Sequence, residues 1–132
     1  MKTDIDIKDD IYLFIKGSKL FYEVNGKLSK TVRPSGSNNE DIVISVLSNQ
    51  NAEIQEAFVN VNIYVKDLVR DNQNEEDTIR LRKLCNIAKS LLNVGRGNDY
   101  RFVLDSQRVL AVEGKNEHFI NNKLLYRQCN ND

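Results

Sequence analysis

The feature that most constrains the fold is the alternation within "AFVNVNIYVKD", residues 57 to 67. Four aliphatic residues there are separated by polar or aromatic ones. The aliphatic positions are Val59, Val61, Ile63 and Val65, and the positions between them are Asn60, Asn62 and Tyr64. Successive side chains of a strand point to opposite faces of a sheet. The segment therefore predicts a strand with one aliphatic face for a core, and one amide and phenol face directed at water, a ligand or another subunit.

Length and composition indicate a single globular domain, residues 1–132. The formal net charge is zero, so there is no general attraction to nucleic acid or anionic membranes. No apolar run approaches the roughly 20 residues that cross a bilayer. The sequence begins "MKTDIDIKDD", which is acidic where a signal peptide is basic and then apolar, so a cytoplasmic location is expected. In that compartment Cys85 and Cys129 are expected to be free thiols.

Residues 7–16 predict a short helix that ends near Gly17, with a strand as the competing interpretation because "IYLFI" is rich in strand formers. The Asn25–Gly26 pair lies between two strand-like runs. Both central residues of a type I′ turn need positive φ, which Asn and Gly tolerate best, so this pair predicts a β-hairpin.

Two polar loops are expected to flank a short buried strand. The first, residues 33–41, holds the only proline and leads into the strand at residues 42–47. The second, residues 48–57, is expected to be a loop or a helical turn. The alternating strand, residues 58–66, follows it.

The clearest helix prediction covers residues 75–93. Asn74 is the expected N-cap and Gly95 the expected residue after the C-cap. An apolar stripe at helical spacing runs along it, formed by Leu81, Leu84, Cys85, Ala88, Leu91 and Leu92.

After this helix the sequence predicts three antiparallel strands with short connections, at residues 100–104, 108–112 and 117–127. Neighbouring strands with two helices and no repeated βαβ alternation are typical of an α+β fold. We expect a mostly antiparallel sheet with one long helix packed on a face and a short N-terminal helix.

Catalytic equipment is sparse. The only histidine, His118, falls in a predicted strand, where a half-exposed structural residue is favoured over a catalytic one. Two cysteines and one histidine, widely spaced, do not make a zinc site. The "GRG" at residues 95–97 follows a helix and lacks the spacing of a phosphate-binding loop. No cofactor or metal is predicted.

One constellation gives an enzymatic alternative. Asp105 at a predicted strand end, followed by Glu113 and Lys115 after the next strand, resembles the PD-(D/E)xK pattern of Mg²⁺-dependent nucleases. The proline is missing, the spacing is short, and charged turn residues are common by chance. "YRFVLDSQR" and "LLYRQ" interleave aromatic and basic residues, as nucleic-acid binders do, but solvent-facing strand residues are the favoured interpretation.

Three segments carry a family resemblance: "VNGKLSKTVRPSGSNNEDIVISVL", "IQEAFVNVNIYVKD" and "EHFINNKLLYR". They resemble small prophage-encoded proteins that are similar to the tail-completion and tail-terminator (neck) proteins of long-tailed phages. The resemblance covers most of residues 11–127. Lys66 stands where these proteins usually have a proline after "NIYV", which leaves the following loop without a family precedent.

The resemblance implies a mixed sheet with helices packed on it, no active site, and a ring, usually hexameric, at the junction between phage head and tail. The implied partners are copies of the chain and phage tail or neck proteins. The neutral net charge and the lack of a long apolar run predict no membrane and no specific nucleic acid among the partners. The implied location is the cytoplasm of the bacterial host, and the virion if the prophage is active. A small cytoplasmic protein-binding module is a further alternative.

A closed ring needs two different, complementary patches on each subunit. The candidate interface combines the second face of the alternating strand with the loop that precedes the buried strand. Its residues are Asn60, Asn62, Tyr64, Arg33, Glu40 and Asp41. Tyr is favoured at interfaces for its mixed polar and apolar character. The alternative is a face that stays in water, as is common for one side of an antiparallel sheet.

Overall fold

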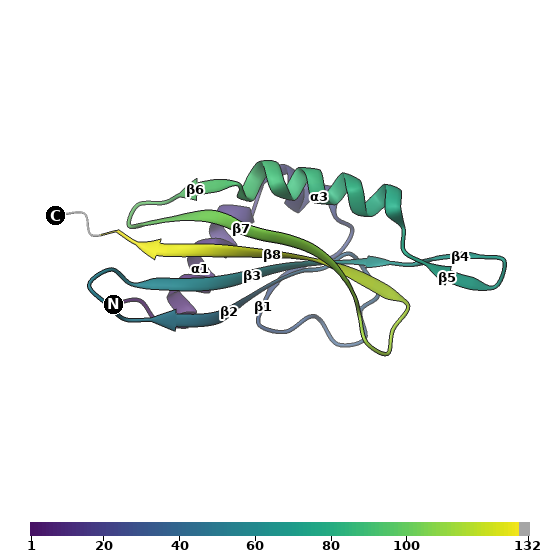
Figure 1. The fold of residues 1–132 in the computed structure, drawn as a ribbon, viewed down its shortest axis with the longest axis horizontal. Helices are drawn as coiled ribbons and strands as arrows, with labels where there is room; N and C mark the ends of the chain where they lie inside the picture. Colours follow the sequence, from purple (N-terminus) through teal and green to yellow (C-terminus); the bar gives the residue numbers. More distant parts are fainter. Residues whose placement is uncertain (130–132) are drawn as a thin grey trace.

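The computed structural model describes residues 1–129, which form three helices and eight strands (Figure 1). The helices are α1 (Asp4–Ile15), α2 (Lys19–Glu23) and α3 (Thr78–Leu92). The strands are β1 (Leu28–Lys30), β2 (Ile42–Gln50), β3 (Glu56–Lys66), β4 (Leu68–Arg70), β5 (Gln73–Glu75), β6 (Val94–Arg96), β7 (Tyr100–Ala111) and β8 (Glu117–Gln128). Among these residues no helix is long and apolar enough to cross a membrane.

Six of the strands form one sheet in the order β1-β2-β3-β8-β7-β6, and β4 and β5 form a separate two-stranded ribbon. Every neighbouring pair is antiparallel except β1 and β2, which are parallel. The predicted α+β fold with a mostly antiparallel sheet is therefore confirmed. The long helix and the N-terminal helix of the prediction are α3 and α1.

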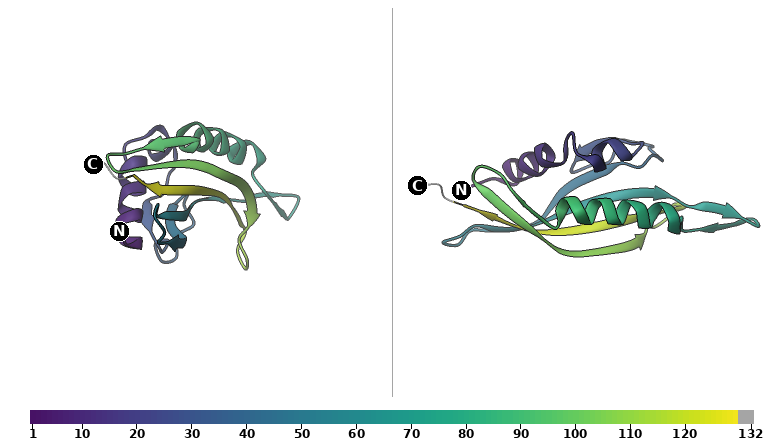
Figure 2. Two further views of the ribbon diagram at one scale, coloured as in Figure 1. Left: turned by 60° about the vertical axis from the view of Figure 1, so that its left-hand side comes forward. Right: turned by 90° about the horizontal axis from the view of Figure 1, so that it is seen from above.

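The helices leave one face of the sheet uncovered. In Figure 1, α1 crosses behind the strands, α3 runs along the β6–β7 side, and no helix lies in front of them. The other views show α1 and α2 together on one side of the strands (Figure 2). The aliphatic residues of β3 face the helices and are buried in one core with Ile11, Leu84 and Leu92, so the predicted alternation of faces is confirmed.

Helix α1 begins three residues before the predicted start because Thr3 caps it. The Thr3 hydroxyl accepts a hydrogen bond from the Asp6 backbone N–H, and the Asp6 carboxylate accepts one from the Thr3 N–H, which is a capping box. Ile7, Ile11 and Ile15 follow at spacings of four and are fully buried. The helix ends at Ile15, before Gly17, whose φ is +80°.

The hairpin predicted at Asn25–Gly26 is wrong. Ser18 caps the short helix α2, and β1 then pairs in parallel with β2. Gly26 is required for close packing, since a Cβ there would lie 2.5 Å from the backbone of Glu40. A type I′ pattern does occur, but at Asp71–Asn72 between β4 and β5, where φ is 50° and 62°.

Two further boundaries differ from the prediction around β3 and α3. Strand β2 continues to Gln50 and β3 starts at Glu56, so the loop between them is residues 51–55 rather than 48–57. The N-cap of α3 is Asp77 rather than Asn74, because residues 73–75 are taken up by β5. Gly95 lies within β6 and does not end the helix.

The segments 100–104 and 108–112 are one strand, not two. Strand β7 runs from Tyr100 to Ala111, and its register against β8 shifts between Leu104 and Ser106. Such a bulge absorbs one extra residue while the pairing continues on both sides. The polar "DSQ" suggested a connection, but only Asp105 is the bulged residue, and Ser106 and Gln107 pair with Lys123 and Asn122 of β8.

Candidate functional site

The uncovered side of the sheet, called here the open face, carries the polar residues of the alternating strand. Along β3 the residues on this face are Phe58, Asn60, Asn62 and Tyr64, all half-buried. Their direct partners on β8 are Leu125, Lys123, Asn121 and Phe119, also half-buried. The open face is therefore a continuous surface of amides, aromatic rings and aliphatic side chains.

A hydrogen-bonded amide cluster occupies its centre. The Asn121 Nδ2 donates to Asn60 Oδ1 at 3.1 Å and to Asn62 Oδ1 at 2.7 Å. Among residues 1–129 no acceptor is bonded to the Nδ2 group of Asn60 or Asn62. The cluster therefore holds two amides in fixed positions with donors left for water or a partner.

Next to the amides, Tyr64 is enclosed between a ring and a guanidinium. Its ring stacks on Phe119 with 5.6 Å between centroids, and the Arg33 guanidinium carbon lies 4.1 Å from the Tyr64 centroid. The Arg33 Nε donates to Asp41 Oδ2 at 2.8 Å, and its two terminal nitrogens donate to the Glu117 carboxylate at 2.9 and 2.7 Å. A paired two-point contact of this kind is geometrically specific. It fastens the loop 33–41 to one end of the open face.

The two carboxylates of this cluster are almost fully buried, at 1% exposed for Asp41 and 3% for Glu117. Burial alone raises the pKa of Asp41, but hydrogen bonds from Ser37, Arg33 and the Lys27 backbone outweigh it and hold that pKa below its ordinary value. Hydrogen bonds from Arg33 lower the pKa of Glu117, more than burial raises it. Both groups are thus held as carboxylates.

These shifts predict an acid-labile fold. A carboxylate whose pKa is lower in the folded than in the unfolded chain stabilises the fold above its unfolded pKa, and that contribution is lost as pH falls through the folded value. With unfolded values of about 3.9 and 4.3, we expect the free energy of unfolding to fall steadily below about pH 5. Urea unfolding from pH 7 to pH 3 measures it. Glu117→Gln should give a shallower slope, and a slope equal to that of the unchanged protein would contradict this assignment.

Glu40 does not belong to the open face. Its carboxylate accepts hydrogen bonds from Nε and Nη2 of Arg80 in α3, both at 2.7 Å. It also exchanges hydrogen bonds with Asn25, through the Asn25 backbone N–H and side chain. Of the three loop residues proposed from the sequence, Arg33 and Asp41 therefore join Tyr64, while Glu40 ties the loop to the helix side.

The residues of the nuclease alternative are not brought together. Asp105 is exposed at the bulge of β7, and Glu113 lies in the turn after that strand. Eight positions of mostly extended chain separate them, on the order of 20 Å. Lys115 pairs with Glu117 at 3.2 Å instead. Within residues 1–129 no group of three or more His, Cys, Asp or Glu residues could hold a metal ion.

His118 is half-buried in β8, as the sequence predicts. Its Nδ1 lies 2.7 Å from Asp67 Oδ1, and its Nε2 lies 4.0 Å from Glu76 Oε2. Asp67 directly follows β3, so this contact ties the ends of β3 and β8 together. It is a structural pair at the start of the β4–β5 ribbon.

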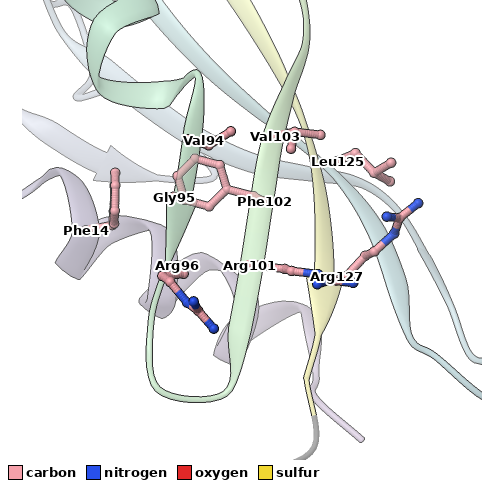
Figure 3. A pocket seen from close by; sticks show the side chains of 9 residues that line it. All are labelled: Phe14, Val94, Gly95, Arg96, Arg101, Phe102, Val103, Leu125 and Arg127. Carbon is pink, nitrogen blue, oxygen red and sulfur yellow. The ribbon is translucent and has the colours of Figure 1, made fainter.

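A basic patch at the other end of the open face was missed as a candidate site. Arg96, Arg101 and Arg127 are consecutive partners across β6, β7 and β8. They line a hollow of about 530 Å³ together with Val94, Val103 and Leu125 (Figure 3). The interleaved "YRFVL" and "LLYRQ" did place arginines on the solvent side of strands, but only the strand register gathers them.

No protein-family model matches the chain, and no curated protein matches it.

Proposed function

We propose that this chain is a non-enzymatic assembly protein of the phage head–tail junction, of the tail-completion or tail-terminator type. It acts by forming a ring with copies of itself and by docking on tail or neck proteins. The observation that carries the proposal is the open face, a half-buried amide and aromatic surface that no helix covers. Its place would be the cytoplasm of the bacterial host, and the virion when the prophage is active.

The composition of the open face suits a protein contact. Tyr64 and Phe119 offer aromatic area, and Asn60 and Asn62 offer amide donors beside it. Interfaces combine such apolar area with hydrogen bonding and are enriched in aromatic residues. The cross-strand hydrogen bonds already fix these side chains, so binding would immobilise less than it would for free side chains.

The contact between copies can be weak in the isolated protein. A tail tube that presents several equivalent sites raises the effective concentration of subunits that have already docked. We therefore expect monomers at low concentration that form small oligomers as the concentration rises, and complete rings on the tail.

Asn62→Arg is expected to impair assembly while leaving the fold nearly intact. It removes one hydrogen bond from Asn121, a loss of about 1 kcal/mol, and places an unpaired charge in the proposed contact. Sedimentation velocity and tail-assembly complementation measure association, and circular dichroism melting measures the fold.

Asn86→Arg is the matched control, because Asn86 is exposed on α3 and the substitution is the same. It should assemble normally. An Asn62→Arg protein that melts and assembles normally would remove the open face from the contact. Portal, capsid or tail-tube genes next to this one would support the head–tail proposal, and their absence would favour a small protein-binding module.

A further inference from the structure

The basic patch holds like charges in direct opposition. Arg96 is the register partner of Arg101, and Arg101 is the register partner of Arg127. Like charges directly opposite one another destabilise a sheet. Arg127 pairs with Glu56 at 2.6 Å, but neither Arg96 nor Arg101 forms an ion pair with any residue between 1 and 129. An external anionic group would lower the repulsion between these guanidinium groups.

The neighbouring row of the same face is apolar. Val94, Val103, Leu125 and Phe58 are consecutive register partners from β6 to β3. Val94 is 65% exposed and Val103 44% exposed. Figure 3 shows the arginine row and the apolar row side by side around the hollow. The patch therefore suits a ligand that has both carboxylates and apolar side chains.

The opposite end of the molecule carries a segment of that character. The β4–β5 hairpin, residues 68–75, extends past the sheet at the end away from β6 (Figure 1). Leu68 and Glu75 are register partners and share one face of this ribbon, whereas Val69 and Asn74 share the other. Residues 68–77 contain one arginine and four acidic residues, and of the acidic ones Asp71, Glu75 and Glu76 are exposed. An isolated two-stranded hairpin is only marginally stable in water, so this one would gain from a partner surface.

We propose that the β4–β5 hairpin of one copy docks on the basic patch of the next copy. The Glu75 carboxylate would pair with Arg96 and Arg101, and Leu68, the register partner of Glu75 on the same face of the ribbon, would meet the apolar row. This inference rests on the proposed function and names the contact that builds its ring. The hairpin and the patch lie at opposite ends of one chain, so the contact is head-to-tail, which closes into a ring when the rotation per subunit allows it.

A protein segment fits the patch better than nucleic acid does. Binding of a single strand without sequence preference uses a basic groove with rings exposed for stacking. Two rings line this hollow: Phe102 is only 2% exposed, and the half-buried Phe14 packs edge-on against it with 4.9 Å between centroids. The neighbouring apolar row is aliphatic apart from Phe58, whose ring is covered by Lys123 Nζ at 4.2 Å. The neutral net charge adds no wider attraction.

Arg101→Glu gives a signature that a purely structural role would not. The new carboxylate lies opposite Arg96 and Arg127, so the melting temperature should rise by a few degrees. Self-association, measured by sedimentation velocity at rising protein concentration and low salt, should weaken about tenfold or more. Glu75→Arg should weaken it similarly, and the double variant should restore association.

Arg82→Glu on the exposed side of α3 is the matched control for net charge and should associate like the unchanged protein. The proposal is overturned if the unchanged protein stays monomeric at every concentration, or if the double variant associates no better than Arg101→Glu. It is also overturned if Arg101→Glu leaves association unchanged and instead abolishes binding of a fluorescein-labelled oligonucleotide.

The same variants separate this contact from the proposed function. In one outcome, Asn62→Arg abolishes tail assembly, whereas Arg101→Glu and Glu75→Arg leave it intact. This result supports the head–tail proposal and overturns the hairpin contact. In the other outcome, the protein self-associates in a charge-dependent way but does not bind phage tails. This result supports the hairpin contact and overturns the head–tail proposal.

Discussion

Replacing Arg33 with alanine is expected to lower the free energy of unfolding by about 3–5 kcal/mol. Arg33 is the bidentate partner of Glu117 and also binds Asp41, and both carboxylates are almost fully buried. The substitution leaves the Asp41 carboxylate without its cation and Glu117 with Lys115 alone, and it uncovers one side of the Tyr64 ring. Urea unfolding at pH 7 measures the loss.

The matched control is Arg127→Ala. Arg127 pairs with Glu56 at the same sheet, but these side chains are 42% and 47% exposed, so less than about 1 kcal/mol should be lost. Equal losses for the two variants would show that Arg33 is not part of a buried network. The triple variant Arg33→Met, Asp41→Asn, Glu117→Gln removes all three charges together. Its free energy of unfolding should be higher than that of Arg33→Ala, because the carboxylates left without Arg33 are what destabilise the single variant.

Arg33 also connects stability to the proposed interface. The same guanidinium that holds the loop 33–41 forms one wall of the Tyr64 site. Arg33 from the loop and Tyr64 from the strand therefore form one ordered surface at this end of the open face, held in place by the buried Asp41. The hydrogen bonds that order it are long-range in sequence, since Arg33 and Glu117 are 84 positions apart.

Features set by short-range periodicity were predicted correctly from the sequence. The faces of β3 follow from period-two alternation, and the buried sides of α1 and α3 follow from apolar residues at helical spacing. The capping box at Thr3 is local too, but it was not predicted, and it explains why α1 starts three residues before the predicted residue 7.

Features set by strand pairing were not predictable in this way. Asn25–Gly26 has the composition of a type I′ turn, yet Gly26 serves a close contact with Glu40, a residue distant in sequence. The observed turn at Asp71–Asn72 lies between "LVR" and "QNE", runs too short to indicate strands. The sequence predicted two strands where β7 is one, because the polar residues at the bulge resemble a connection and nothing local shows that β8 pairs with both parts.

The candidate site also has a part that local sequence predicts and a part that depends on strand pairing. The alternation alone put Asn60, Asn62 and Tyr64 on one face. The strand register brings Asn121 to the amides of Asn60 and Asn62. The path of the loop directs Glu40 to Arg80 rather than to the open face. Neither contact could be predicted from the alternation. The basic patch depends on register entirely.

Leu84→Ala is expected to lower the free energy of unfolding by about 2–5 kcal/mol, through lost apolar burial and the cavity that remains. Leu84 is fully buried on the side of α3 that meets the sheet, in the same cluster as Val61 and Ile63.

The matched control is Leu91→Ala on the same helix. Leu91 is only partly buried and borders a surface hollow, so its truncation should cost clearly less. Thermal melting followed by circular dichroism compares the two. A Leu84→Ala protein whose melting temperature falls by less than a degree or two would contradict the packing of α3 on the sheet. An equal loss at both positions would mean that α3 is rotated from the orientation that exposes Leu91, and the sequence stripe, which treats both leucines as core, would then be the better guide.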